Sequence, residues 1–266
     1  MIDYEKICRS TISTAVEAGR FLREERKKFS IDRVETKGLH DFVSYVDRGA
    51  EELIVKELSR ILPDAGFIAE EGTVGIENKH YRWVIDPLDG TTNFIHGISP
   101  FAVSIALMEA NEVVVGVVYE VSLDECFYAW KGSTSFLNGA PISVSSAKSI
   151  QDSLVATGFP YYDFSKTPEY LQILEFFMRN SHGVRRLGSA ATDLSYVAAG
   201  RFDAFYEYSL QPYDVAAGSF IVAQAGGFVS DFSGNSNFIF GKEIVACNNL
   251  IKSDFLETVK RYLNNK

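Results

Sequence analysis

Apolar residues recur at helical spacing near the start of the chain. Residues 4–29 carry Ile7, Ile12, Ala15 and Ala18 at intervals of three to five positions, which predicts an amphipathic helix. The run of charged residues that follows this apolar stripe is expected to face solvent as the helix ends.

A second helical pattern follows a polar stretch. Residues 30–40 are mostly polar and are expected to form a loop. Residues 41–62 place Val46, Leu53 and Leu58 on one face, which predicts a second amphipathic helix. Both helices offer one apolar face each, so we expect them to cover the same layer of the protein.

Short apolar runs rich in β-branched residues, separated by turn residues, then predict a series of strands. These runs cover residues 67–69, 81–85, 101–108, 113–119 and 125–130. An Asn138-Gly139 pair marks a further tight turn. We therefore expect a mostly antiparallel sheet packed against the two helices.

The pattern changes after residue 145, where a polar connector marks a candidate domain boundary. Strands are expected at residues 154–158, 184–187, 202–208, 228–230 and 244–246, and helices at residues 168–179, 190–199, 214–225 and 253–263. Alternating strands and helices are typical of an α/β layer. The sequence thus predicts an α+β half over residues 1–145 and an α/β half over residues 146–266.

One stretch in the first half combines features of a metal and phosphate site. The apolar run before Asp86 reads as a buried strand, and Pro87 is expected to end it. Asp89 follows, and Gly90 and Thr91 suit a turn and the N-cap of a helix. Carboxylates bind hard cations such as Mg²⁺, and helix N-termini bind phosphate. The same residue types also form ordinary turns, so this stretch alone leaves both interpretations open.

Other acidic residues have ordinary explanations as well. Asp47 suits the first turn of its helix, where the helix dipole favours a negative charge. Glu70 and Glu71 could be a solvated pair at a strand end, and Asp214 could be a helix N-cap. Each is also a candidate carboxylate ligand that a separate element would deliver to the same site.

Composition narrows the classes of function. The 266 residues carry a net charge of −9, which argues against direct nucleic-acid binding and requires cations beside any phosphate substrate. With 46% hydrophobic residues there is ample material for a core. The three cysteines are too scattered for a disulfide framework or a zinc site. No signal peptide or membrane-spanning run is recognisable, so we expect a cytoplasmic protein.

Several segments together resemble one known family. Residues 83–94 are similar to the first signature of the inositol monophosphatase family, W-[VI]-[IV]-D-P-[LI]-D-G-T-x-N-[FY]. Residues 213–218 are similar to its second signature, W-D-x-A-[AG]-[GA], with Tyr213 in place of Trp. Residues 41–47 and 67–71 resemble its D-[LF]-V-T-x-x-D and F-[IL]-[GA]-E-E segments. The shared order and spacing outweigh the explanations of these residues as turns and caps.

The resemblance implies a fold and a metal site. The fold would be a layered αβαβα sandwich of the inositol monophosphatase and fructose-1,6-bisphosphatase type. The activity would be that of a Mg²⁺-dependent, Li⁺-sensitive phosphoric monoester hydrolase with two or three Mg²⁺ per site. Glu70, Asp86 and the backbone carbonyl of Leu88 would bind one ion, and Asp86, Asp89 and Asp214 another, so that Asp86 bridges them.

Roles in catalysis are implied in the same way. Glu70 and Thr91 would position the attacking water, and Asp47 would orient the Thr91 hydroxyl. Backbone N–H groups of Gly90 and Thr91 would hold the phosphate. The implied mechanism is direct attack by a metal-activated water, without a covalent phospho-enzyme.

Substrate contacts are implied on two further segments. The residues are Asp89, Gly188, Ser189, Ala190, Glu207 and Asp214. Glu207 would accept hydrogen bonds from a polyol, although it could also be a solvated residue at a strand end. Arg185 and Arg186 could contact a second phosphate or simply pair with acids. The expected reaction is hydrolysis of inositol-1-phosphate to inositol and phosphate.

Two alternatives remain open at this level. The same chemistry could act on fructose-1,6-bisphosphate, a 3′-phosphonucleotide or histidinol phosphate. Some bacterial relatives are also regulatory partners of the RNA-making machinery, so a protein-binding role is the alternative of another class. Because the family usually forms homodimers, we expect a homodimer that contacts neither membrane nor nucleic acid directly.

Overall fold

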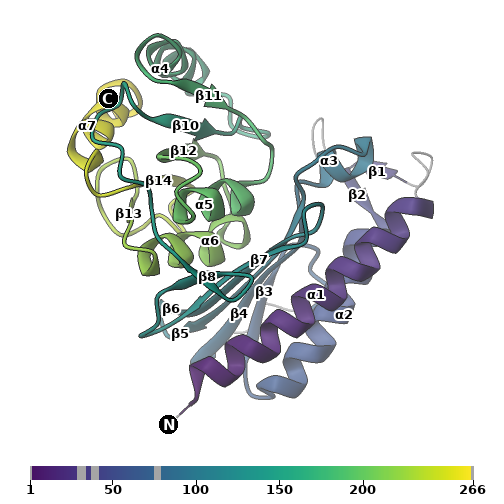
Figure 1. The fold of residues 1–266 in the computed structure, drawn as a ribbon. Coiled ribbons are helices and arrows are strands. Elements are labelled where there is room, and N and C mark those ends of the chain that lie inside the picture. The colour runs from purple at the N-terminus through teal and green to yellow at the C-terminus, as the bar shows by residue number, and fades with distance from the viewer. Residues whose placement is uncertain (1, 29–33, 37–41, 75–78, 265–266) are drawn as a thin grey trace.

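The predicted helices and strands stack as five alternating layers of helices and sheets (Figure 1). The computed structural model describes residues 2–28, 34–36, 42–74 and 79–264. The layers are, in order, α1 (Tyr4–Lys28) with α2 (Tyr45–Ile61), a seven-stranded sheet, α5 (Ala190–Ala198) with α6 (Pro212–Gln224), a five-stranded sheet, and α4 (Thr167–Asn180) with α7 (Lys252–Leu263). The expected αβαβα sandwich is confirmed.

The seven-stranded sheet contains seven consecutive strands of the first half in sequence order. They are β3 (Gly66–Ala69), β4 (Tyr81–Asp89), β5 (Ala102–Glu109), β6 (Glu112–Glu120), β7 (Glu125–Trp130), β8 (Ser135–Leu137) and β9 (Ala140–Ile142). Only β3 and β4 pair in parallel; the other neighbours are antiparallel, as the hairpin turns predicted.

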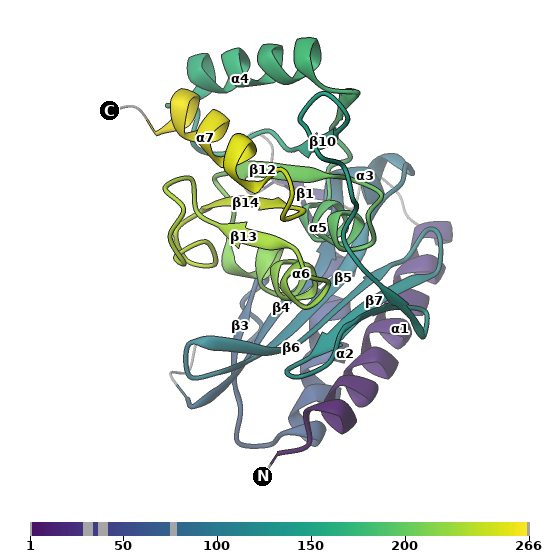
Figure 2. The same cartoon turned by 60° about the vertical axis from the view of Figure 1, so that its left-hand side comes forward.

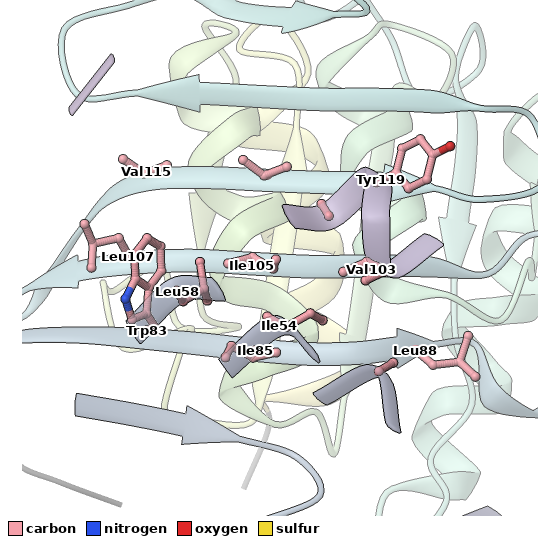
Figure 3. Close-up of a cluster of buried hydrophobic side chains, with 14 of the residues drawn as sticks. Ile54, Leu58, Trp83, Ile85, Leu88, Val103, Ile105, Leu107, Val115 and Tyr119 are labelled. Carbon is pink, nitrogen blue, oxygen red and sulfur yellow. The ribbon is translucent and has the colours of Figure 1, made fainter. Parts of the chain in front are cut away.

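The first two helices bury their apolar faces against this sheet. Figure 3 shows Ile54 and Leu58 of α2 beside Trp83, Ile85 and Ile105 of the sheet, all of them buried. Burying a large apolar side chain contributes about 1.5–3 kcal/mol. The apolar face of α2 that the sequence pattern predicts is therefore the face that packs against β4 and stabilises its position.

The five-stranded sheet contains the strands of the second half. Its order is β11 (Gly183–Arg185), β10 (Leu154–Thr157), β12 (Ala204–Tyr208), β14 (Glu243–Cys247) and β13 (Phe228–Ser230). Strand β10 pairs in parallel with both of its neighbours, and β14 is antiparallel to both of its own. The division into halves at residue 145 stays a prediction. No helix within the described ranges is long and apolar enough to cross a membrane.

Helix α6 lies between the two sheets and packs against both of them (Figure 2). Gly116 of β6 permits this close packing, because a Cβ there would lie 2.9 Å from the Ala217 carbonyl oxygen. Two sheet hydroxyls, those of Ser104 and Ser135, donate to backbone carbonyls of the α6 segment at 3.2 and 2.6 Å. The start of α6 is thus fixed near the end of β4.

The region before α2 differs from expectation. A helix was expected from residue 41, but α2 begins at Tyr45, and the described part of the expected polar loop forms a strand. Strand β1 (Val34–Thr36) pairs antiparallel with β2 (Phe42–Ser44). Both segments are rich in β-branched or aromatic residues, which favour a strand over the first turn of a helix. Asp41 lies outside the described residues.

Glu109 fastens the first helix to the sheet. Its carboxylate accepts hydrogen bonds from the hydroxyls of Tyr4 (2.6 Å) and Tyr81 (2.7 Å), and His80 Nε2 lies 3.4 Å away. The Tyr4 bond, then the Tyr81 bond, lower the pKa of Glu109 from its ordinary 4.5 to about 2. These bonds stabilise the fold above the unfolded-state pKa, and their contribution is lost as the pH falls through the folded-state pKa.

We therefore expect Glu109→Gln to reduce the loss of stability between about pH 4.5 and pH 2. Urea unfolding at a series of pH values measures this difference. Glu112→Gln is the matched control, because Glu112 is an exposed residue of the same hairpin paired with Lys131. Identical pH dependence in wild type and Glu109→Gln would contradict the role of the tyrosine hydrogen bonds.

Candidate active site

Strand β4 delivers two carboxylates to one pocket. Its pairing with β5 is regular up to Asp86, opposite Ser104, and shifts before Asp89, opposite Ala102. The shift includes Pro87, which has no N–H for the ladder, so the strand bulges there rather than ending. The prediction that the strand ends at Asp86 is therefore wrong, since β4 runs on to Asp89. Both carboxylates line the pocket.

Gly90 makes the turn from β4 into the short helix α3 (Thr91–His96). Its φ of +89° is a left-handed conformation that glycine adopts without strain. A Cβ at this position would lie 3.0 Å from the Pro100 carbonyl oxygen and 3.3 Å from that of Gly188. The cap position belongs to Gly90, so the expectation of Thr91 as N-cap is wrong.

Gly90→Ala is expected to destabilise the fold by about 1–3 kcal/mol and to lower phosphate release, because the turn must move away from Pro100 and Gly188. Gly139→Ala is the matched control: Gly139 has nearly the same φ, +88°, but nothing lies within 4 Å of a Cβ there. Thermal unfolding and phosphate release on both variants measure the effect. Equal loss of activity in both would contradict a specific role of the Gly90 turn.

Thr91 and Asp47 lie on neighbouring elements at this turn. The Thr91 hydroxyl donates to the Leu88 carbonyl oxygen at 2.9 Å. Asp47 lies in the first turn of α2, as predicted, and its side chain is buried. The relay expected from Asp47 through Thr91 would need the hydroxyl to turn away from Leu88, and it stays a prediction.

The start of α5 holds Asp89 in place. The Ser189 hydroxyl donates to Asp89 Oδ2 at 2.6 Å, and the Ala191 N–H donates to the same oxygen at 2.7 Å. Ser189 is also the N-cap of α5, since its hydroxyl accepts from the Thr192 N–H. These two bonds occupy one oxygen of Asp89, whose side chain lines the pocket.

Asp214 is placed in a similar way by the start of α6. Its Oδ2 accepts the Gln211 N–H at 2.6 Å in a capping box. Gln211 is the N-cap and Asp214 the third helical residue, so the alternative of Asp214 as N-cap is wrong. The side chain lines the same pocket as Asp86 and Asp89.

Glu70 and Glu71 point to different surroundings. Glu70 lines the pocket, and its N–H donates to the Ile85 carbonyl oxygen of β4 at 3.3 Å. Glu71 is not a solvated strand-end residue, because its side chain is only 2% exposed and lies 3.7 Å from Arg48 Nε. Strand β3 thus brings one carboxylate of the pair to the site.

Four of the carboxylates that line the pocket, those of Glu70, Asp86, Asp89 and Asp214, lie close enough to repel one another. Burial raises the pKa of Asp86 and Glu70 well above their ordinary values, and the charges of neighbouring acids raise them further. Burial likewise raises the pKa of Asp89 to about 6 and that of Asp214 to about 7. Asp86 is central, within hydrogen-bonding reach of both Glu70 and Asp214. Such a set favours a bound cation.

The donor chemistry fits Mg²⁺, which binds carboxylate and carbonyl oxygens. Within the described ranges, no three His, Cys, Asp or Glu side chains are already arranged as a finished metal site. Asp86 nevertheless interacts with both Glu70 and Asp214, so the candidate ligands lie on neighbouring side chains. The assignment of these residues as metal ligands remains a proposal.

The rest of the pocket would receive the substrate. Glu207 of β12 is buried and lines it, and a Cβ on Gly158 would lie 2.0 Å from its carboxylate oxygen. The alternative of Glu207 as a solvated residue is therefore wrong. Burial raises the pKa of Glu207, which the charge of Arg186 partly offsets. Gly188, Ser189 and Ala190 line the same pocket.

The two arginines predicted near a second phosphate separate. Arg185 is exposed, and its guanidinium donates to the carbonyl oxygen of Val184. Arg186 lines the pocket, donates to the Tyr161 hydroxyl at 3.0 Å and lies over the Phe159 ring, 5.4 Å from its centroid. Only Arg186 is therefore placed to contact a ligand.

Sequence reasoning missed Asp193 and the aromatic wall formed by Phe159, Tyr161 and Tyr162. Asp193, in the first turn of α5, is 1% exposed, and burial followed by the charges of Glu207 and Asp89 raises its pKa. An acid inside an otherwise apolar helix was the available signal for Asp193. The wall has no such signal, because nothing local links a loop after β10 to the carboxylates on β4.

Fold and site together define a class: an αβαβα sandwich with an acid-lined pocket at the ends of β4, β10 and β12. Residues 3–264 match the inositol monophosphatase family, so the chain belongs to that family. Members are phosphatases, generally Mg²⁺-dependent, whose substrates are phosphorylated polyols.

Individual relatives carry two kinds of name. An inositol-1-monophosphatase of Mesorhizobium japonicum is 41% identical over 254 residues, covering 95% of this chain and 96% of its own. A Nus factor SuhB of Pseudomonas aeruginosa is 40% identical over 257 residues, covering 95% of each. The crystal structure of extragenic suppressor protein suhB from Bartonella henselae superposes with a TM-score of 0.90 at 41% identity, covering 96% of this chain and 99% of that one.

Proposed function

We propose that this protein hydrolyses a small phosphate monoester with Mg²⁺, and that inositol-1-phosphate is the substrate. The observation that carries the proposal is the set of four carboxylates converging on Asp86 beside the Gly90 turn. A phosphate group cannot enter so acidic a pocket unless cations neutralise it. The family to which the chain belongs uses Mg²⁺ for that purpose.

The ligands proposed for one Mg²⁺ are Glu70, Asp86 and the Leu88 carbonyl, and those for a second are Asp86, Asp89 and Asp214. Bound Mg²⁺ would neutralise charge on the phosphate and leaving oxygens and lower the pKa of a water molecule. Two or three ions per site are compatible with the number of carboxylates.

The other residues of the pocket would position the reactants. Backbone N–H groups of Gly90 and Thr91 would hold the phosphate, and the side chains of Glu70 and Thr91 would hold the attacking water. Asp47 would orient the Thr91 hydroxyl once it turns from Leu88. Such positioning can supply several kcal/mol of the rate enhancement, because it removes the entropic cost of bringing reactants together.

Substrate selection would fall to the far side of the pocket. Glu207 would accept hydrogen bonds from a polyol, next to the Ser189 and Ala190 segment. A hydrogen-bonding carboxylate rejects an analogue that lacks the hydroxyl, since the buried acceptor would then lose its partner. This favours a hydroxyl-rich substrate such as inositol-1-phosphate.

A second candidate function is hydrolysis of a bisphosphate by the same site. The position of Arg186 favours it, because a guanidinium that lines the pocket can bind a second phosphate in a bidentate manner. Fructose-1,6-bisphosphate and a 3′-phosphonucleotide both carry such a group. Histidinol phosphate does not, and would instead place a cation near Glu207.

A regulatory role is the candidate of another class. The relative from Pseudomonas aeruginosa is named a Nus factor, which favours a protein partner in the transcription machinery. Capture of the same partner by wild-type protein and by Asp89→Asn would support this role, because binding of a protein need not use the pocket. We also propose that the protein is a homodimer and that it is cytoplasmic. Gel filtration with light scattering would test the oligomeric state.

The deciding experiment is Mg²⁺-dependent phosphate release from inositol-1-phosphate, fructose-1,6-bisphosphate, 3′-phosphoadenosine 5′-phosphate and histidinol phosphate. The proposal expects the highest kcat/KM with inositol-1-phosphate. A preference for a bisphosphate would keep the chemistry and overturn the substrate. Absence of release from all four by folded, Mg²⁺-binding protein would overturn the enzymatic proposal in favour of the regulatory one.

A further inference from the structure

Helix α2 holds a buried acid that no catalytic role uses. Glu51 lies one helical turn after Asp47 and has no exposed surface. A buried carboxylate is costly unless it is well hydrogen-bonded. The surroundings of Glu51 therefore show what the protein gains from it.

Among the described residues, three hydrogen bonds reach the Glu51 carboxylate, and all of them come from the segment directly after Glu70. The Glu71 N–H donates to Oε2 at 2.7 Å. The N–H and the hydroxyl of Thr73 both donate to Oε1, at 2.8 and 2.6 Å. Three donors at 2.6–2.8 Å converge on this side chain, so it fixes the backbone of residues 71–73.

Glu70 is consequently held from two sides. Its own N–H bonds to the Ile85 carbonyl oxygen of β4, and the next N–H along the chain, that of Glu71, bonds to Glu51. The Glu71 side chain adds an ion pair with Arg48, also on α2. Its backbone is thus fixed between the sheet and the helix, in a position from which its side chain lines the pocket.

We propose that Glu51 is a positioning residue of the active site, which keeps Glu70 aimed at Asp86 without itself touching metal or substrate. This inference rests on the proposed Mg²⁺-dependent function. Substituting groups that orient a metal ligand typically lowers metal affinity by about 10–100-fold. The same range is expected for loss of the Glu51 carboxylate.

Glu51→Gln tests the proposal, because it keeps the shape of the side chain but replaces one acceptor oxygen with an NH₂ group. That NH₂ group would face either the Glu71 N–H or the N–H and hydroxyl of Thr73, which are donors themselves. Glu52→Gln is the matched control, since Glu52 is exposed and adjacent on the same helix. Titration of MgCl₂ into each substrate-free protein, followed calorimetrically, gives the Mg²⁺ affinity. Hydrogen exchange of the Glu71 and Thr73 amides in metal-free protein reports directly on their hydrogen bonds to Glu51.

The expected result for Glu51→Gln is Mg²⁺ affinity weakened by about tenfold or more, faster exchange at Glu71 and Thr73, and kcat largely recovered at saturating Mg²⁺. A merely structural role would lower the folded fraction and leave the Mg²⁺ affinity of the folded molecules unchanged. Affinity within about twofold of wild type in folded Glu51→Gln would overturn the proposal.

A second variant keeps the test decisive if Glu51→Gln does not fold. Thr73→Val removes one donor to Glu51 and preserves the side-chain shape, so it should weaken Mg²⁺ binding in the same direction but less. Unchanged affinity in Thr73→Val would then overturn the proposal. If wild-type protein binds no Mg²⁺, the proposed function itself fails, an outcome distinct from equal affinities in wild type and variant.

Discussion

Asp89→Asn and Asp214→Asn are each expected to lower Mg²⁺-dependent kcat/KM by more than about 100-fold, since even residues that only orient a metal ligand cost 10–100-fold. In both side chains one oxygen accepts hydrogen bonds from the protein, and the second oxygen is the proposed metal ligand. Asparagine replaces that second oxygen with an NH₂ group, which cannot ligate a cation.

The fold should survive both substitutions. Ser189 and Ala191 both donate to the same oxygen of Asp89, and Gln211 donates to a single oxygen of Asp214. An asparagine carbonyl can accept these bonds, so the starts of α5 and α6 keep their caps. Phosphate release together with circular dichroism and thermal unfolding of each variant measures both parts of the prediction.

Asp231→Asn provides a matched control. Asp231 is also mostly buried and accepts two backbone N–H bonds, from Ser233 and Asn235, with one oxygen. It does not line the pocket. The control should retain wild-type turnover. Near-normal turnover in Asp89→Asn or Asp214→Asn would refute the assignment of these residues as metal ligands.

Local patterns mark the acidic residues of the pocket as candidates, and the resemblance to the inositol monophosphatase family favoured a site over turns and caps. In the sequence, Asp86 and Asp89 come after an apolar run and Asp214 comes before one, so each lies at the edge of a recognisable pattern. The two facing helices and the hairpins are likewise fixed by apolar periodicity and turn residues. These patterns place an acidic residue on a helix or strand, but they do not predict which other residues its side chain faces.

Features that depend on contacts between distant segments escaped prediction. The bulge at Pro87 requires the neighbouring strand β5, and the cap at Gly90 depends on close packing against Pro100 and Gly188. Neighbours in sequence, Arg185 and Arg186, differ in environment, because Arg185 is the exposed last residue of the edge strand β11 and Arg186 follows it and lines the pocket. The hydrogen bonds of Glu51 join residues 20 and 22 positions apart in the sequence, which no helical or strand periodicity predicts.

Removal of Mg²⁺ is expected to abolish phosphate release and to lower the melting temperature. Asp86 and the three acids around it repel one another, and in metal-free protein only protonation or displacement relieves their repulsion. Mg²⁺ at about 100 times its dissociation constant stabilises a protein by about 2.7 kcal/mol, which corresponds to about 5–10 °C at this chain length. Thermal unfolding in EDTA and in excess MgCl₂ measures the shift, with CaCl₂ as a comparison for ion selectivity.

Asp86→Asn separates the stabilising effect of the ion from its chemistry. Asp86 is 2% exposed and central to the repulsion, and the Leu88 N–H that it accepts at 3.0 Å can still bond to an asparagine carbonyl. Removing one negative charge should therefore raise the melting temperature of the metal-free protein while phosphate release is lost. Because the shared ligand is gone, excess MgCl₂ should add little further stability. A variant that melts at a lower temperature than wild type in EDTA would contradict the predicted repulsion between the carboxylates. A variant that keeps the full Mg²⁺-dependent increase in melting temperature would contradict the role of Asp86 as a shared ligand.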